Sequence, residues 1–248
     1  MSWRAALLCA SFGLLTWLAW AAHPLQQPAK PHPGTQAAGF PNTGESLDYT
    51  IKWPGGATLG DAHLQAAKSN GGWQFDFSLS ASVPGFSVAD HYHSRANADL
   101  CSLDLEKEAR HGNRTAHERT VFDYQQGMAT RTTLTKGGGH TDINIDGCAH
   151  DGLDFIYYTR RELAQGHGVP PEQDVLFGAS YSVRMQYAGV EDVTVAGKRR
   201  PADHILLSVT GPASDSKAEL FLARDAARTP LLVKVPVALG TFSMELVR

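Results

Sequence analysis

The sequence lacks an excess of positive charge. Its 22 Lys and Arg residues are outnumbered by 25 Asp and Glu residues, which gives a net charge of −3. A protein with this balance has no general electrostatic attraction for nucleic acid or for an anionic lipid surface. We therefore expect no nucleic-acid partner.

The sequence also lacks the short motifs of nucleotide binding and of serine hydrolases. There is no Gly-x-Ser-x-Gly elbow or dinucleotide fingerprint, and Gly137–Gly139 is not followed by the lysine and helix of a phosphate loop. The segment His117–Val121 begins like a zinc-protease motif but has valine in place of the second histidine. Asp142–Gly147 resembles the start of a calcium loop, but Leu153 replaces the closing glutamate. We therefore favour a strand and a turn at Asp142–Gly147. From the absence of these motifs we expect no catalytic residues, cofactor or metal.

Only one long apolar run is present, and it lies at the start of the chain. Arg4 precedes the apolar segment Ala5–Ala19, and small residues suited to signal peptidase follow. A membrane anchor is the alternative, but the run is shorter than the roughly 20 residues that a bilayer requires, and Pro24 follows soon after it. We predict that Met1–Ala21 is a cleaved signal peptide. The protein would then be periplasmic or secreted, with no transmembrane segment after cleavage.

Cysteine is rare, with three residues in the chain. Cys9 belongs to the predicted signal peptide, so Cys101 and Cys148 alone would remain after cleavage. In an oxidising compartment two thiols are a candidate disulfide. Two separate buried thiols are the alternative, and we favour the disulfide because of the export signal.

The rest of the chain divides into a tether and one domain. Residues 22–43 are rich in proline and predict a disordered tether, whereas residues 44–248 predict a single β-rich domain. In Trp73–Val83, apolar and polar residues alternate, which is typical of a strand with one buried face. Similar alternation recurs in Leu47–Trp53, Cys101–Lys107, Val183–Tyr187 and Phe242–Leu246.

Gly-rich turns separate these strands, which favours an antiparallel meander. One segment departs from the pattern: Asp151 can begin a helix of about fifteen residues, and Gly166 can end it. The fold class that we predict is mainly β. It has a single curved antiparallel meandering sheet, a half-barrel or open barrel, with one amphipathic helix packed on it or plugging it.

Aromatic residues are the first candidate binding groups. Trp73, Phe75, Phe77 and Tyr157 are best interpreted as core, because large aromatic side chains dominate the interiors of proteins. A face that binds a ligand is the alternative interpretation of the same four residues, and we keep them as candidates.

Histidines and carboxylates are the second group. His91 and His93 share one face of a predicted strand, and Asp90 lies on the other. They could form half of a metal site with His111 and His117, but a solvated strand face is the favoured interpretation. Scattered groups such as Asp90, His91 and Glu118 could serve a hydrolase only if the fold brought them together.

Several segments resemble an exported bacterial family catalogued as domain of unknown function 3108. Leu47–Gly60 is similar to the opening hairpin of that family, Asp90–Ser94 to its middle strands, and Phe155–Arg161 to its helix. Leu222–Leu246 is similar to its final hairpin, so the resemblance covers nearly all of the chain after the tether. The resemblance implies an envelope protein with a curved antiparallel sheet, related in shape to periplasmic lipoprotein carriers, and it supplies no catalytic residues.

These observations lead to three hypotheses. The first is an exported, non-catalytic protein whose curved sheet binds an amphiphilic ligand or an envelope partner, such as a lipid, a glycan or an envelope protein. The second is an envelope hydrolase that acts on glycan or lipid. The third is a structural envelope-assembly factor, which would expose an apolar patch on the sheet.

Overall fold

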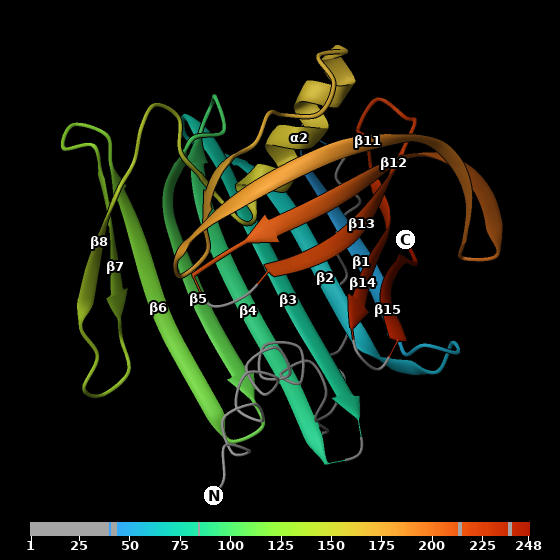
Figure 1. Cartoon of the computed structure of the whole chain (residues 1–248), viewed down its shortest axis with the longest axis horizontal. Helices are drawn as coiled ribbons and strands as arrows, with labels where there is room; N and C mark the ends of the chain where they lie inside the picture. The colour runs from blue at the N-terminus through green and yellow to red at the C-terminus, as the bar shows by residue number, and fades with distance from the viewer. Residues whose placement is uncertain (1–39, 41–43, 84, 213–214, 238–239) are drawn as a thin grey trace, which may run out of the picture.

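The computed structural model describes residues 40, 44–83, 85–212, 215–237 and 240–248 (Figure 1). The predicted signal peptide lies outside these residues, as does the predicted tether apart from Phe40. Phe40 itself is buried, in contact with the main hydrophobic core.

The described residues form one large sheet and one helix. The strands of the sheet lie in the order β8-β7-β6-β5-β4-β3-β2-β1-β15-β14-β13-β12-β11-β10-β9. Their bounds are β1 Gly44–Lys52, β2 Thr58–Ser69, β3 Gly72–Val83, β4 Phe86–Asn97, β5 Ser102–His111, β6 Arg114–Asp123, β7 Met128–Thr133, β8 His140–Asn144, β9 His150–Asp151, β10 Gln173–Leu176, β11 Ser180–Val195, β12 Lys198–Thr210, β13 Asp215–Ala223, β14 Pro230–Val237 and β15 Gly240–Leu246.

Most neighbouring strands are consecutive in the chain and antiparallel. The two exceptions are the antiparallel pair β1 and β15, which joins the two ends of the domain, and the parallel pair β9 and β10. The sheet is not closed into a barrel, because β8 and β9 are its two edges. The prediction of a mainly β, curved, meandering antiparallel sheet is confirmed.

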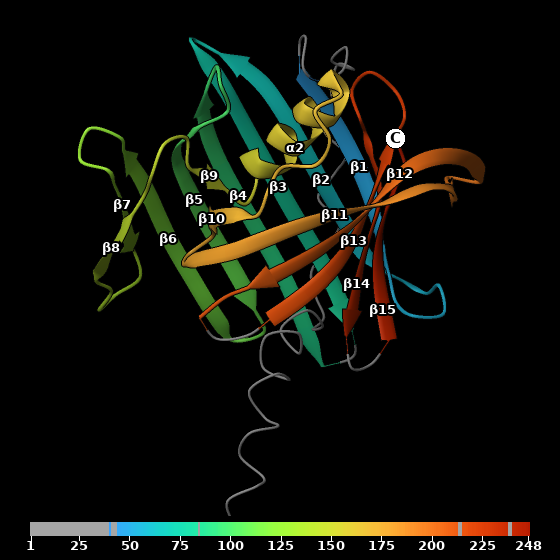
Figure 2. The same ribbon diagram turned by 45° about the horizontal axis from the view of Figure 1, so that its top comes forward.

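The sheet curls, so that one half faces the other. Strands β1 to β8 form one arm, and strands β11 to β13 cross in front of the concave side of that arm in both views (Figures 1 and 2). The turn between β10 and β11 contacts the facing arm, where the Phe177 ring lies 4.9 Å from the ring of Tyr92 and edge-on to it. The fold is therefore an incomplete barrel.

The alternation in the sequence separates the two faces of this sheet. On β3, Trp73, Phe75 and Ala81 are buried, whereas Ser78 and Ser80 point outward and are exposed. The outer, convex face is rich in charged and histidine side chains, and the inner, concave face is largely apolar. At Gly60 on β2, a Cβ atom would lie 1.9 Å from the carbonyl oxygen of Ser80, so this position requires glycine.

The single described helix, α2, spans Asp154–Gln165 and lies at one end of the hollow between the arms (Figure 2). Its buried residues include Phe155, Tyr157 and Leu163, which face the sheet. Gly166 ends it in the left-handed conformation, with φ of 81°. The predicted helix is confirmed, with its first residue three positions after Asp151. Among the described residues, no helix is long and apolar enough to cross a membrane.

The main core lies between α2 and the centre of the sheet. Tyr157 stacks on Phe75 with ring centroids 4.2 Å apart, and Phe40 packs edge-on against Tyr157. Arg160 of α2 is completely buried beside these rings and makes a bidentate ion pair with Glu45 of β1. These contacts fix the helix on the concave side of the sheet.

Candidate functional site

The concave side beyond α2 carries apolar side chains that are only partly buried. We call this set the concave apolar surface. Its residues come from both arms, and they are Phe77, Leu79, Tyr92, Leu207, Val209, Val233 and Met244. Each packs against one of the two large core clusters but keeps part of its area accessible. Partly exposed apolar groups on a concave face are the usual lining of a site for an apolar ligand.

The four predicted ligand-face residues divide between the core and this surface. Three of them are buried where α2 packs on the sheet. They are Trp73, Phe75 and Tyr157, with 6%, 0% and 0% of their area exposed. Phe77 is partly exposed and stacks on Tyr92. Because the strands alternate, Phe77 is next to Phe75 on the same face of β3. The boundary between core and accessible surface therefore falls between these two positions.

One cross-strand row on this face runs from apolar to charged. The register aligns Phe77 of β3 with Tyr92 of β4, Lys107 of β5 and Glu118 of β6. The rings of Phe77 and Tyr92 stack with centroids 5.7 Å apart. Lys107 lies 3.9 Å from Glu118 and 4.5 Å from the ring centroid of Phe177. An apolar surface thus ends at an ion pair within the same row.

The charged end of the row is partly shielded from water. The Lys107 and Glu118 side chains are each 18% exposed, and Arg131 of β7 lies 3.8 Å from Glu118. Burial lowers the pKa of Lys107, and the carboxylates of Glu118 and Asp90 oppose that shift. These groups can offer a cation and an anion to the polar head of a bound molecule. The sequence contained no local signal for Lys107 or Arg131, because the cluster depends on register across four strands.

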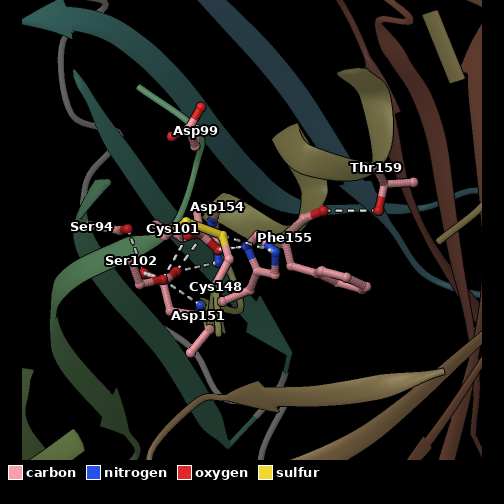
Figure 3. Close-up of polar contacts among 12 residues, drawn as sticks. Ser94, Asp99, Cys101, Ser102, Cys148, Asp151, Asp154, Phe155 and Thr159 are labelled. Carbon is pink, nitrogen blue, oxygen red and sulfur yellow. Dashed lines mark hydrogen bonds and ion pairs between the residues drawn. A yellow bond between two sulfur atoms is a disulfide. The ribbon is translucent and has the colours of Figure 1, made fainter. Parts of the chain in front are cut away.

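Near the start of α2, a disulfide ties the start of β5 to the segment before β9. Cys101 and Cys148 are bonded, with Cα atoms 4.9 Å apart, as predicted from the export signal and the cysteine count (Figure 3). The backbone N–H of Ser102, the next residue, donates to the carbonyl oxygen of Ala149. The disulfide and this hydrogen bond hold edge strand β9 against the opposite arm.

A buried polar cluster lies beside the disulfide, and we call it the polar node: Ser94, Ser102, Asp151 and Asp154 (Figure 3). All four residues are fully buried. Ser94 donates to Asp151 Oδ2 at 2.5 Å, and Ser102 Oγ lies 2.6 Å from Asp154 Oδ2. Asp151 Oδ1 accepts the backbone N–H groups of Leu153 and Asp154, at 2.7 and 3.1 Å. Asp151 thereby satisfies amides at the start of α2.

Burial governs the protonation of this node. It raises the pKa of Asp151 to about 7, an effect that the nearby Asp154 increases, and it raises the pKa of Asp154 well above the ordinary value. His150 stacks on Tyr158 and is also buried, which lowers its pKa to about 4. Between about pH 4 and pH 7, two protonated carboxyl groups and a neutral imidazole can therefore share this site. The node positions β4, β5, β9 and α2 relative to one another.

Asp90, His91 and Glu118 do not come together. Asp90 and Glu118 lie on the concave face, where Asp90 contacts His111 at 2.7 Å. His91 lies on the convex face, with 58% of its side chain exposed. The trio that the hydrolase hypothesis named is therefore divided between the two sides of the sheet.

A surface pocket of about 400 Å³ opens beside the turn between β2 and β3. Its lining includes Trp73 and Leu100, together with the cationic side chains of Lys68 and Arg161. A second pocket, of about 470 Å³, lies at the turn between β5 and β6. Neither pocket includes a residue of the concave apolar surface or of the polar node.

Comparison with known proteins gives the following matches. A family model described as "Protein of unknown function (DUF3108)" matches residues 48–247. No curated protein matches the chain. Among solved structures, the chain is similar to a beta-barrel-like protein of domain of unknown function DUF1849 from Brucella abortus, with 10% identity and a TM-score of 0.58. That alignment covers 82% of this chain and 95% of the other.

A protein from Bacteroides fragilis described as having a YmcC-like fold also aligns, with 10% identity and a TM-score of 0.32. The alignment covers 86% of this chain and 98% of that one. At these identities, the likeness to the Brucella protein concerns the fold alone.

Proposed function

The chain belongs to the DUF3108 family of proteins of unknown function, and we propose that it is an exported, non-catalytic protein that binds an amphiphile on its concave apolar surface. The occupant that fits is a molecule with one acyl chain and a polar head. The chain would lie along the partly exposed side chains of both arms, and the head would lie near Lys107 and Arg131.

The cross-strand row carries this proposal. Phe77 and Tyr92 present stacked rings beside the ion pair of Lys107 and Glu118, within one row of the concave face. Removing apolar area from water stabilises a complex by roughly 25 cal/mol per Å². A partly shielded ion pair next to that area can exchange a protein partner for a ligand head group. Apolar and charged groups in this order match an amphiphile better than a uniformly polar glycan.

Export is supported by two independent features. The first is the signal-like segment Met1–Ala21, which lies outside the described residues. The second is the bond between Cys101 and Cys148, because disulfides persist mainly in oxidising compartments. A periplasmic or secreted location would also place the protein where lipids move between membranes through water.

Titration with a fluorescent fatty acid tests the proposal. We expect the purified full chain to bind 11-(dansylamino)undecanoic acid saturably, with a blue shift of the dansyl emission. Leu79→Gln places an amide on the concave apolar surface without a large change of volume, and it should weaken binding about tenfold. Val121→Gln is the matched control, because Val121 is 45% exposed and lies on the convex face.

Two results would overturn the proposal. One is the absence of saturable binding by the wild-type protein when circular dichroism shows that it is folded. The other is equal weakening of binding by the concave and the convex variants, since binding would then not depend on the concave face.

A further inference from the structure

The convex face carries a cluster of metal-ligating side chains on β5 and β6. His117 Nε2 lies 2.6 Å from Glu106 Oε1 and 3.7 Å from Glu108 Oε1. One ligand atom from each of these three residues can be chosen so that all lie within 4.8 Å of one another. The side chains are between 36% and 59% exposed, so an ion can reach them from solvent.

Strand geometry explains why these donors meet. Glu106 and Glu108 are two positions apart on β5, so both side chains point to the convex face. The register of β5 with β6 places His117 directly opposite Glu108. Arg119 is opposite Glu106, but its guanidinium lies 3.8 Å from Asp104. Glu106 is therefore directed to the imidazole.

Two carboxylates that converge on one imidazole differ from an ordinary surface ion pair. A His and a single carboxylate are balanced when the imidazole is protonated. Here the second carboxylate leaves an excess of negative charge that a divalent cation would neutralise. Zinc binds His nitrogen and Glu oxygen at about 2.0–2.2 Å, so its tetrahedral ligands lie roughly 3.4 Å apart. Small side-chain rotations bring the three donor atoms to that spacing.

A fourth donor is available on the neighbouring strand β4. The register aligns His91 with Glu108, so the His91 imidazole is on the same face and next to the cluster. Its Nε2 lies 3.9 Å from Asp76 Oδ1, beyond hydrogen-bond distance, and its side chain is 58% exposed. His93, by contrast, is held by Asp76 at 2.7 Å. His91 is therefore the imidazole that can turn to the cluster.

We propose that Glu106, Glu108 and His117, with His91 as the fourth ligand, bind a divalent transition-metal ion, with Zn²⁺ as the ion best suited to this set. Two imidazoles and two carboxylates are donors that Zn²⁺ accepts readily, whereas Ca²⁺ and Mg²⁺ prefer oxygen ligands alone. The ion would bridge β4, β5 and β6 on the side of the sheet that faces away from the concave apolar surface. This site is independent of the proposed function.

Calorimetry with ZnCl₂ on the full chain, after dialysis against chelator and then against buffer, tests the proposal. We expect one Zn²⁺ per chain. His117→Gln and the double variant Glu106→Gln/Glu108→Gln should each weaken binding at least tenfold, and His91→Gln should weaken it by a smaller factor because water can replace one ligand. His63→Gln is the matched control and should leave the affinity unchanged.

Cobalt supplies a second readout that does not depend on heat signals. Co²⁺ bound to the wild-type protein should give the visible absorption of a four-coordinate site, and His117→Gln should abolish it. The proposal is overturned if the wild-type protein takes up no stoichiometric Zn²⁺, or if His117→Gln binds Zn²⁺ as tightly as the wild type. Unchanged binding by His91→Gln would overturn the assignment of the fourth ligand.

Discussion

Replacing Asp151 with asparagine should change how the stability of the fold depends on pH. Asp151 is fully buried in the polar node, where it accepts hydrogen bonds from Ser94 and from two amides at the start of α2. Asparagine has nearly the same shape and keeps a carbonyl oxygen for those amides. It carries no ionisable proton, so the substitution removes one titration from the folded state and leaves the packing in place.

The magnitude follows from the difference between the folded and the unfolded state. Burial, with the neighbouring Asp154, raises the pKa of Asp151 from 3.8 to about 7 in the folded protein. Between these values the folded state holds a proton that the unfolded state has lost, so Asp151 makes the wild-type protein less stable as the pH rises. About three pH units at ~1.4 kcal/mol each give ~4 kcal/mol.

His150 makes the unfolding free energy change with pH in the opposite direction. Burial lowers its pKa to about 4, so over the window from there up to its ordinary value of 6.5 the unfolded state binds the additional proton, and stability rises with pH. The charge of Asp151 opposes this lowering, so Asp151→Asn lowers the pKa of His150 further, which alters the comparison only near pH 4. The informative quantity is therefore the difference in unfolding free energy between Asp151→Asn and the wild type, which should shift by ~4 kcal/mol in favour of the variant from pH 4 to pH 7.

Urea denaturation followed by circular dichroism at one-unit intervals from pH 4 to pH 8 measures this difference. It should rise across the window and level off above about pH 7, where the folded carboxyl group ionises. Asp142→Asn, at an exposed aspartate of β8, should leave the pH profile unchanged. A difference that stays flat between pH 4 and pH 7 would refute the reasoning, because Asp151 would then be ionised in the folded protein.

Three further predictions test other parts of the fold, each by urea denaturation at pH 7. The double variant Cys101→Ser/Cys148→Ser should lose ~4 kcal/mol, because the bond closes a chain segment of 47 residues, and a loss below 1 kcal/mol would contradict this. Arg160→Met should cost about 3–5 kcal/mol by leaving Glu45 buried without a partner, and adding Glu45→Leu should recover much of it. Phe75→Ala should cost about 3–5 kcal/mol through the cavity beneath α2, and a cost below 1 kcal/mol would show that the site collapses.

Local patterns in the sequence were enough to predict the fold class and several of its elements. Alternation in Trp73–Val83 corresponds to β3, and the helical periodicity after Asp151 corresponds to α2. The disulfide followed from compartment and cysteine count. The resemblance to the DUF3108 family is confirmed by the match to residues 48–247. Each of these inferences needs only neighbouring residues, a composition or an ordered set of motifs.

The candidate sites depended on information that a local pattern does not contain. Lys107 and Glu118 meet Tyr92 only through the register of three strands, and a shift of one residue would turn each side chain to the other face. Phe75 is buried because Tyr157 of α2 stacks on it, whereas Phe77 on the same face stacks on Tyr92 and stays partly exposed. Strand register also decides the faces of the histidines. It places His117 on the face of His91 and His93, and His111 on the other face with Asp90.

The pairing of β1 with β15 has a consequence for how the protein is made. Tyr49 pairs with Leu246, so the centre of the sheet is assembled from the first and the last strands of the domain. Such a contact closes a very long loop, which makes it slow to form. During synthesis, β1 must wait with one edge unpaired until β15 has emerged. Loss of β15 alone would then leave two half-sheets with exposed inner edges, a form suited to chaperone capture or to aggregation.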